Sequence, residues 1–158
     1  MTAANQPGIQ IVSQYIKDFS FENPNAPESL IGGWGAPDTN VQIALRHAKL
    51  RDDTYECVLG LRVEATKKDD KGNLRTYFIT DLAYGGLAVL QNIPADQHQA
   101  VVMVEVPKLL FPFARQIVSD AASQGGYPPL YLAPINFEAL YLMEMKKLQG
   151  EKAATNQN

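Results

Sequence analysis

The sequence predicts an α+β fold in which a four-stranded antiparallel sheet carries two C-terminal helices packed on one face. In four stretches before Gly86, apolar and polar residues alternate with a period of two, as in strands that bury one face. After Gly86 the apolar residues recur at helical spacing instead. Strands and helices are therefore unmixed along the chain, which is typical of α+β domains, and 158 residues suffice for one such domain.

The first predicted strand begins at Ile9. Its alternation places Phe19 and Phe21 on one face, because successive strand residues point to opposite sides of a sheet. Asp18 and Glu22 must then share the other face. We expect the two carboxylates to point outward, away from the core.

A long crossing loop follows this strand. Residues 23–38 hold three prolines and three glycines around Trp34. Loops of this length inside a compact domain are often functional, so we expect the crossing loop to take part in binding. Pro24 and Pro27 should stiffen it, and a stiff loop loses less conformational entropy when it binds a partner.

Three further strands are predicted at residues 39–50, 54–68 and 74–86. The segment "DDKGN" at residues 69–73 has the composition of a hairpin turn, since glycine and asparagine tolerate positive φ. Short links between consecutive strands favour an antiparallel meander or a Greek key.

The first predicted helix covers residues 109–126, with Pro112 tolerable near its start and Gly125 as its end. Its apolar stripe consists of Leu110, Phe113, Ile117 and Ala121. The preceding residues 95–107 are ambiguous, because their β-branched side chains favour a strand and their polar flank favours a helix.

The second predicted helix begins after an N-cap at Asn136 and ends near Gly150. Polar residues without periodicity lie at both ends of the chain. We therefore expect a single domain at residues 9–149 between two flexible tails, residues 1–8 and 150–158.

The predicted layers leave apolar surface uncovered. The fourth strand is expected to expose Tyr77 and Ile79 on the face opposite Phe78. In the first helix, Leu109 and Val118 fall outside the apolar stripe. Surplus apolar surface is usually covered by another subunit or a ligand, so an oligomer is expected.

The formal net charge of −3 argues against a general nucleic-acid-binding protein, which needs clustered basic residues. Lys67, Lys68 and Lys71 form one basic cluster, but aspartates interrupt it, and it is interpreted as a solvated hairpin tip. No apolar run is long enough to span a bilayer, and the N-terminus lacks the features of an export signal. With a single cysteine, Cys57, the chain fits a reducing, cytoplasmic compartment.

The sequence contains no recognisable set of catalytic residues and no set of metal ligands. His47 and His98 have no cysteine, histidine or carboxylate at metal-ligand spacing, and Cys57 lies on an inward strand face. The glycine pairs lack the context of a phosphate-binding loop. The sequence therefore predicts a binding protein, with no metal or other cofactor, rather than an enzyme.

Three segments together resemble the SecB protein-export chaperones of Gram-negative bacteria. They are "KDFSFENPNAP" at residues 17–27, the glycine pair at residues 85–86, and "FPFARQIVSDAASQGGYPPLYLAPINFEAL" at residues 111–140. The resemblance implies a cytosolic homotetramer, built as a dimer of dimers, that binds unfolded preproteins and delivers them to the SecA ATPase. It also implies no catalysis, no nucleic-acid partner and no insertion into the membrane.

The resemblance further implies two sets of site residues. The SecA-binding set is Asp18, Glu22, Ile79 and Asp81. The client-binding set is expected to line a groove between the crossing loop and the second helix, and it comprises Phe21, Leu30, Ile31, Trp34, Phe137, Tyr141 and Leu142. Aromatic side chains offer contact area without hydrogen-bond selectivity, which suits a site that accepts many unfolded sequences.

Two alternative functions remain open from the sequence. A sheet with a helical lid could enclose an apolar pocket and act as a carrier of a small apolar ligand. A SecB-like chaperone of a toxin–antitoxin system would share the fold, but it is expected to lack the carboxylates Asp18, Glu22 and Asp81.

Overall fold

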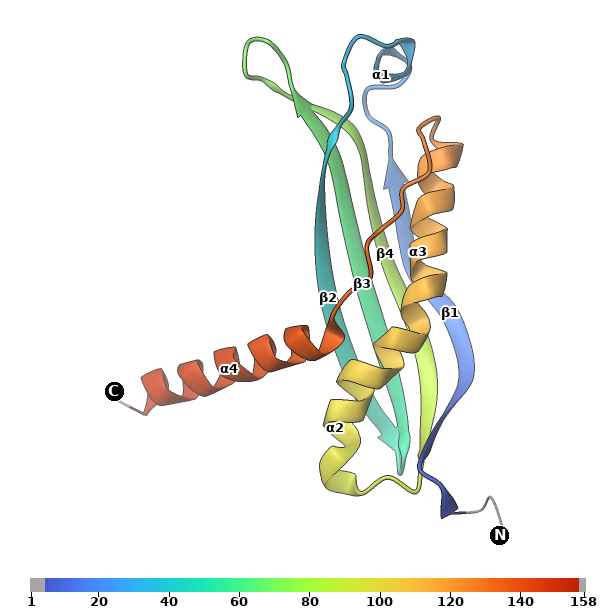
Figure 1. Ribbon diagram of the computed structural model, residues 1–158, viewed down its shortest axis with the longest axis vertical. Helices are drawn as coiled ribbons and strands as arrows, with labels where there is room; N and C mark the ends of the chain where they lie inside the picture. The colour runs from blue at the N-terminus through green and yellow to red at the C-terminus, as the bar shows by residue number, and fades with distance from the viewer. Residues whose placement is uncertain (1–4, 157–158) are drawn as a thin grey trace.

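The computed structural model describes residues 5–156 and contains one antiparallel sheet (Figure 1). Its strands are β1 (Gly8–Glu22), β2 (Asp38–Arg51), β3 (Thr54–Lys68) and β4 (Leu74–Gln91). They lie in the order β1-β4-β3-β2, so that β2, β3 and β4 are joined by hairpins and β1 lies beside β4. This order is a Greek key, one of the two topologies predicted from the strand spacing.

The hairpin between β3 and β4 has the predicted turn at residues 69–73. Asp69 accepts hydrogen bonds from the backbone N–H groups of Lys71 and Asn73, each at 2.9 Å. Gly72 adopts a φ of 81°, which a residue with a side chain rarely does. The turn chemistry thus confirms the predicted hairpin.

The crossing loop between β1 and β2 contains the short helix α1 (Glu28–Ile31). Two asparagine side chains connect it to distant elements: Asn23 Nδ2 donates to the carbonyl of Gly125 at 2.9 Å, and Asn25 Nδ2 donates to that of Thr76 at 2.8 Å. These bonds hold the loop in place beside β4 and the end of the long helix.

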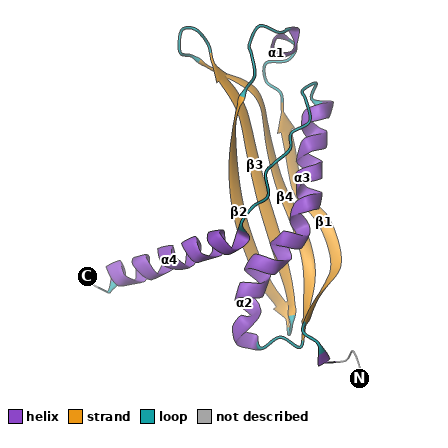
Figure 2. Ribbon diagram, in the orientation of Figure 1, coloured by secondary structure: helices purple, strands orange, loops and turns teal. Residues whose placement is uncertain are grey.

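The long helix is continuous from residue 95 to residue 124 (Figure 2). It consists of η2 (Ala95–Gln97), α2 (His98–Ala100), the π-helical segment η3 (Val101–Glu105) and α3 (Val106–Gln124). Residues 95–107, ambiguous in the sequence, are therefore helical. Pro112 lies inside α3 and not near a helix start as predicted, because the helix begins much earlier.

This helix covers one face of the sheet, where it packs mainly on β3 and β4. The fully buried side chains of this interface include Leu59, Leu61, Leu82, Val102, Val106, Leu110 and Val118. The prediction that the first helix packs on the sheet is thus confirmed. Its predicted apolar stripe is wrong in part, because Phe113 is 51% exposed, whereas Val118, expected outside the stripe, is fully buried. Among the helices within residues 5–156, none combines the length and apolarity that crossing a lipid bilayer demands.

Two adjacent glycines of β4 allow close contacts on both faces of the sheet. A Cβ atom at Gly86 would lie 2.7 Å from Cδ2 of Leu110, which belongs to α3. On the other face, a Cβ atom at Gly85 would lie 2.4 Å from the ring of Tyr15 in β1. The glycine pair therefore lets α3 approach one face and Tyr15 lie flat on the other.

The second helix, α4 (Phe137–Thr155), differs from the prediction. Asn136 is the N-cap as predicted, its side chain accepting a hydrogen bond from the N–H of Ala139 at 3.0 Å. The helix projects away from the sheet, however, and only Phe137 is buried (Figure 1). The expectation that both helices pack on the sheet is therefore wrong for α4.

The predicted ends of the domain differ in part from the observed elements. β1 already begins at Gly8, and α4 extends through Thr155 rather than ending near Gly150. Residues 1–4 and 157–158 of the predicted tails lie outside the described residues. The flexibility of both tails stays a prediction.

Tyr77 is another departure from the prediction, which placed it on an exposed face. Its exposed fraction is 4%, because the crossing loop covers it. The ring of Trp34 meets that of Tyr77 edge-on, with 5.1 Å between centroids, and the Tyr77 hydroxyl donates to the carbonyl of Gly35.

We predict that Gly85→Ala lowers the free energy of unfolding by about 1–3 kcal/mol, since the added methyl group would push the ring of Tyr15 off the sheet. Urea denaturation at one fixed protein concentration measures the change. Gly150→Ala is the control, because no atom lies within 4 Å of a Cβ there. This variant should be as stable as the wild type or more stable by up to about 1 kcal/mol. Equal stability of Gly85→Ala and wild type would contradict the packing of Tyr15.

Candidate functional site

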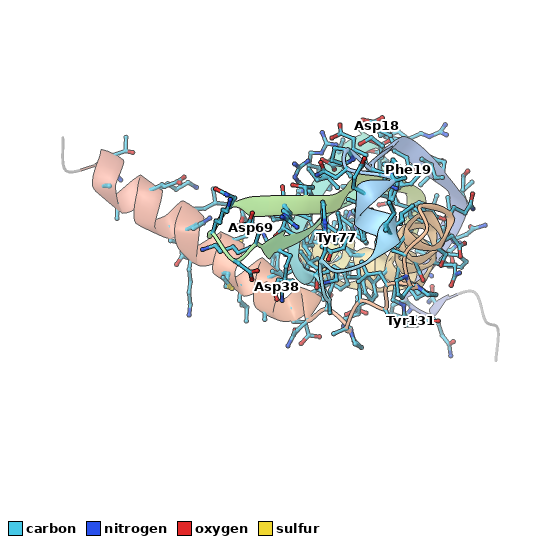
Figure 3. All side chains as sticks on the ribbon, turned by 90° about the horizontal axis from the view of Figure 1, so that it is seen from above. Asp18, Phe19, Asp38, Asp69, Tyr77 and Tyr131 are labelled. Atoms are coloured by element: carbon cyan, nitrogen blue, oxygen red, sulfur yellow. The ribbon has the colours of Figure 1, made fainter. Side chains whose placement is uncertain are left out.

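The sheet face opposite α3 collects the four predicted SecA-binding residues. Across β1 and β4, Asp18 lies opposite Ala83, and Glu22 lies opposite Ile79. Residues opposite each other in an antiparallel pair point to the same side of the sheet, and Asp81 lies two positions from Ile79 on that side. Figure 3 shows Asp18 on the side away from α3. The outward carboxylates of β1 and the Ile79–Asp81 pair of β4 therefore belong to one surface.

Strand β3 adds two residues that the sequence analysis did not assign to the site. Arg62 lies opposite Asp81, and Glu64 lies opposite Ile79. The guanidinium of Arg62 donates to Asp81 Oδ2 at 3.0 Å and to Glu64 Oε1 at 2.9 and 3.0 Å. The alternation of residues 54–68 predicts that both side chains face outward. Which residues of β4 lie beside them depends on the strand register. We call the surface formed by Asp18, Glu22, Arg62, Glu64, Ile79 and Asp81 the acidic face.

The charges on the acidic face are unequally compensated. Hydrogen bonds to Asp81 and then to Glu64 raise the pKa of Arg62, and the Asp81 side chain remains 51% exposed. Asp18 and Glu22 are exposed and have no hydrogen-bond or ion-pair partner within residues 5–156. The two β1 carboxylates therefore carry the uncompensated negative charge.

A second polar cluster on this side of the sheet is neutralised internally. Glu56 accepts hydrogen bonds from the Tyr15 hydroxyl and from Lys17 Nζ, the latter at 2.6 Å. The bond from Lys17, then that from Tyr15, lowers the pKa of Glu56. Burial, followed by the bond to Glu56, raises the pKa of Tyr15 to about 12. Glu56 therefore stays ionised but adds little net charge to the surface.

Four of the predicted client-binding residues lie at the crossing-loop end of the sheet, and we call Phe21, Leu30, Ile31 and Trp34 the crossing cluster. Phe21 stacks on Phe78 at 5.4 Å and lines a groove of about 510 Å³ between β1 and the end of α3. Leu30 and Ile31 are 44% and 80% exposed, and Trp34 is half-buried. This end therefore presents apolar surface to solvent.

The other three, Phe137, Tyr141 and Leu142, lie at the start of α4. Phe137 is 1% exposed and packs against Phe111, with 6.1 Å between ring centroids. Tyr141 lines a separate cleft of about 260 Å³ beside Ile43 of β2, and Leu142 is exposed. We call these three residues the α4 cluster.

One subunit does not bring the two clusters together. The predicted groove required the second helix to run beside the crossing loop, whereas α4 leaves the body of the domain (Figure 1). Within a subunit the client-binding set therefore forms two surfaces. Phe137 is a core residue and stabilises the start of α4.

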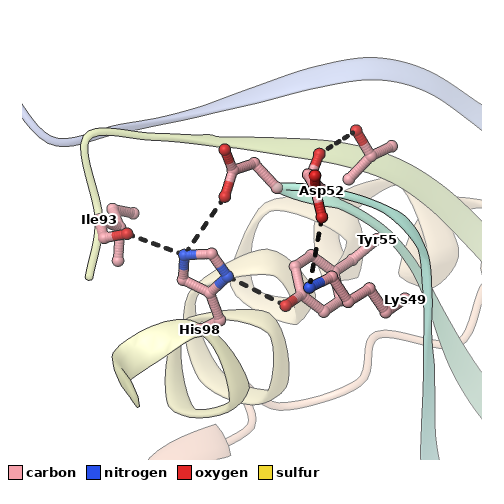
Figure 4. Close-up of polar contacts among 7 residues, drawn as sticks. Lys49, Asp52, Tyr55, Ile93 and His98 are labelled. Atoms are coloured by element: carbon pink, nitrogen blue, oxygen red, sulfur yellow. Dashed lines mark hydrogen bonds and ion pairs between the residues drawn. The ribbon is translucent and has the colours of Figure 1, made fainter. Parts of the chain in front are cut away.

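The histidine and cysteine that the sequence analysis set aside have structural positions. His98 is 5% exposed, with Nδ1 3.0 Å from the Tyr55 hydroxyl and Nε2 2.8 Å from the carbonyl oxygen of Ile93 (Figure 4). Through these contacts the buried His98 links the turn after β4 to β3. Cys57 is fully buried as predicted, and burial raises its pKa to about 12. Within residues 5–156, no three potential ligand residues gather as a metal site.

Comparison with protein families gives one match that spans most of the chain. The family model of the preprotein translocase subunit SecB matches residues 2–148. The chain is 44% identical over 147 residues to the protein-export protein SecB of Sphingopyxis alaskensis, which covers 92% of this chain and 81% of that protein. It is 48% identical over 130 residues to SecB of Rhodospirillum centenum, covering 82% and 74%, respectively.

Among solved structures, the fold is similar to that of the Mycobacterium tuberculosis Rv1957 SecB-like chaperone, determined in complex with a ChAD peptide from the Rv1956 HigA1 antitoxin. The TM-score is 0.65, and the match covers 80% of this chain and 90% of that one. The sequences are only 12% identical, so this likeness concerns the fold alone.

Proposed function

The chain belongs to the SecB family of protein-export chaperones, and from this premise we propose which of its surfaces bind SecA, clients and other subunits. The protein keeps unfolded preproteins translocation-competent in the cytoplasm and delivers them to SecA. The observation that carries the proposal is the acidic face, an uncovered sheet surface on which Glu22 lies opposite the apolar Ile79 and Asp18 lies farther along β1, opposite Ala83. Members of a chaperone family bind polypeptides rather than transform them, so no enzymatic activity is expected.

The acidic face suits a small, basic docking module of SecA. Carboxylates steer a cationic partner during diffusion, and an apolar residue among them contributes contact area that salt does not screen. Ile79 is half-buried between Glu22 and Glu64, its neighbours on β1 and β3. Arg62 offsets part of the negative charge, and a docking cation must compete with it for Asp81.

Clients bind at the crossing cluster and at Tyr141 and Leu142 of the α4 cluster, whereas the buried Phe137 supports these two residues from the core. Both surfaces present aromatic and aliphatic side chains, which contact extended chains of many sequences. Trp34 occupies a glycine-rich part of the crossing loop, where Gly33 and Gly35 adopt φ values of 86° and 78°. In the proposed assembly a neighbouring subunit extends these clusters into a longer groove, which links client binding to assembly.

We propose assembly as a homotetramer, a dimer of dimers, and apolar surface that one subunit leaves uncovered supports an oligomer. The exposed large apolar residues include Val12 and Ile16 of β1, Leu109 and Phe113 of α3, and Leu142, Met143 and Leu148 of α4. Exposed apolar surface on this scale usually marks a subunit interface. β1 is also an edge strand, so its outer backbone groups are available for pairing with another chain.

We predict that Asp18→Asn combined with Glu22→Gln weakens binding to purified SecA by about 2- to 30-fold at low ionic strength, because two exposed charge pairs are lost. Titration calorimetry measures the affinity. Glu144→Gln with Glu151→Gln is the matched control, since it removes the same charge from exposed positions of α4. An equal loss in the control, or loss of client binding in the test variant, would contradict the assignment of the acidic face.

Arg62→Gln should act in the opposite direction and tighten SecA binding by about threefold at low ionic strength. The substitution frees Asp81 and Glu64 from their internal partner and makes the face more negative. The gain should shrink as salt is added, because the freed charges are exposed. Weaker binding would instead mean that Arg62 holds the carboxylates in the docking geometry.

Trp34→Ala should lower the affinity for a reduced, unfolded client at least about fivefold, since buried aromatic contacts dominate many interfaces. Competition against a labelled unfolded protein gives the affinity. Tyr131→Ala is the control, because Tyr131 is an aromatic residue that is 81% exposed outside both clusters. Unchanged client affinity in Trp34→Ala would remove the crossing loop from the client site.

A further inference from the structure

A cleft of about 360 Å³ lies where the crossing loop meets the hairpin between β3 and β4. Gly33 and Trp34 form one wall, and residues of the hairpin, from Lys67 to Arg75, form the other. Both loops lie at the same end of the sheet (Figure 1). The cleft falls within the usual range of ligand pockets, about 300–1,000 Å³.

Positive charge predominates in this cleft. Its lining includes the cations Lys67, Lys68, Lys71 and Arg75 and the anions Asp69 and Asp70. The chain as a whole has a net charge of −3, so the excess of cations is local. We call this site the cationic cleft.

The two kinds of charge are not equally available to a ligand. Asp69 is occupied by the hairpin itself: the backbone N–H groups of Lys71 and Asn73 donate to it, and its side chain is only 14% exposed. The ammonium groups of Lys67, Lys68 and Lys71 have no hydrogen-bond or ion-pair partner within residues 5–156. The free groups in the cleft are therefore mainly cations.

Arg75 is held in position by an aromatic ring. Its guanidinium lies 5.1 Å from the centroid of the Trp34 ring, and one of its nitrogens is 3.6 Å from Asp69. Trp34 is in turn fixed edge-on against the buried ring of Tyr77. A stacked guanidinium keeps its remaining donors in a fixed plane, which favours the binding of a carboxylate. The Arg75 side chain is 42% exposed, so these donors are accessible.

We propose that the cationic cleft is a subsite for acidic segments of unfolded clients, in which aspartate or glutamate side chains bind Arg75 and the free lysines beside Trp34. The inference rests on the proposed chaperone function and adds a preference to it. An acidic segment would otherwise be repelled by a protein of negative net charge. The subsite lets the protein retain such segments next to the apolar contacts of the crossing cluster.

Two observations favour a polypeptide over a nucleic acid. Asp69 and Asp70 also line the cleft, and they would face part of a continuous phosphate backbone. The cations are confined to one cleft, whereas nucleic-acid binding uses an extended basic surface. Carboxylates separated by uncharged residues fit the mixed lining better.

Two unstructured peptides of equal length and equal aromatic content test the proposal. One carries glutamates and aspartates, and the other carries glutamine and asparagine at the same positions. Fluorescence anisotropy at low ionic strength should show that the wild-type protein binds the acidic peptide about three- to tenfold more tightly. In the variant Lys67→Gln, Lys68→Gln, Lys71→Gln this preference should disappear, while the affinity for the amide peptide stays unchanged.

The control variant is Lys146→Gln, Lys147→Gln, Lys152→Gln, which removes the same charge from exposed positions of α4. It should keep the preference for the acidic peptide. Equal loss in the control would make the preference a net-charge effect and overturn the proposal. Competition by a single-stranded oligonucleotide as effective as that of the acidic peptide would also overturn it, in favour of a general polyanion site. If the wild type binds neither peptide, the chaperone proposal fails as well, whereas equal binding of both overturns the subsite alone.

Discussion

The close approach of α3 to the sheet at Gly86 is the contact on which the two-sided character of this domain depends. Leu110 occupies the space that a side chain at Gly86 would fill, so the helix lies directly on β3 and β4 and buries every second residue of both strands. On the reverse face, Gly85 leaves room for Tyr15 and lets β1 lie flat against β4. Because one helix covers one face only, the alternate residues of the central strands remain available to partners.

The period of two predicted that Asp18 and Glu22 face outward, but not which residues are their neighbours. Asp18 and Glu22 share a face for any register, whereas the positions of Glu22 beside Ile79 and of Asp18 beside Ala83 depend on how β1 pairs with β4. Arg62 could be recognised as outward-facing, yet its position beside Asp81 follows from pairing between β3 and β4. Such pairings join residues that are far apart in the sequence, and the alternation within one strand does not predict them. The burial of Tyr77 has the same origin, since a distant loop covers it.

The two helices show how packing overrides local preference. Val102, Val104 and Val106 are β-branched and favour strands, but each is buried within the long helix, where contacts with the sheet outweigh a weak intrinsic bias. In α4 the opposite holds, because its helical residues find no surface to cover beyond Tyr141. A helix of 19 residues gains most of its stability from packing. The sequence could therefore locate α4 but not its partner surface, which a neighbouring subunit would supply in the proposed assembly.

Net charge alone is a poor guide to the partners of this protein, because negative and positive side chains occupy different parts of β3. Glu64 belongs to the acidic face and Lys67 to the cationic cleft, and three residues of a strand separate them by about 10 Å. At physiological ionic strength the screening length is about 8 Å, so salt weakens the interaction between the two surfaces. In the proposed function, a cationic module of SecA binds one of these surfaces and an acidic client segment binds the other. Strand register, rather than composition, decides which partner each charge can reach.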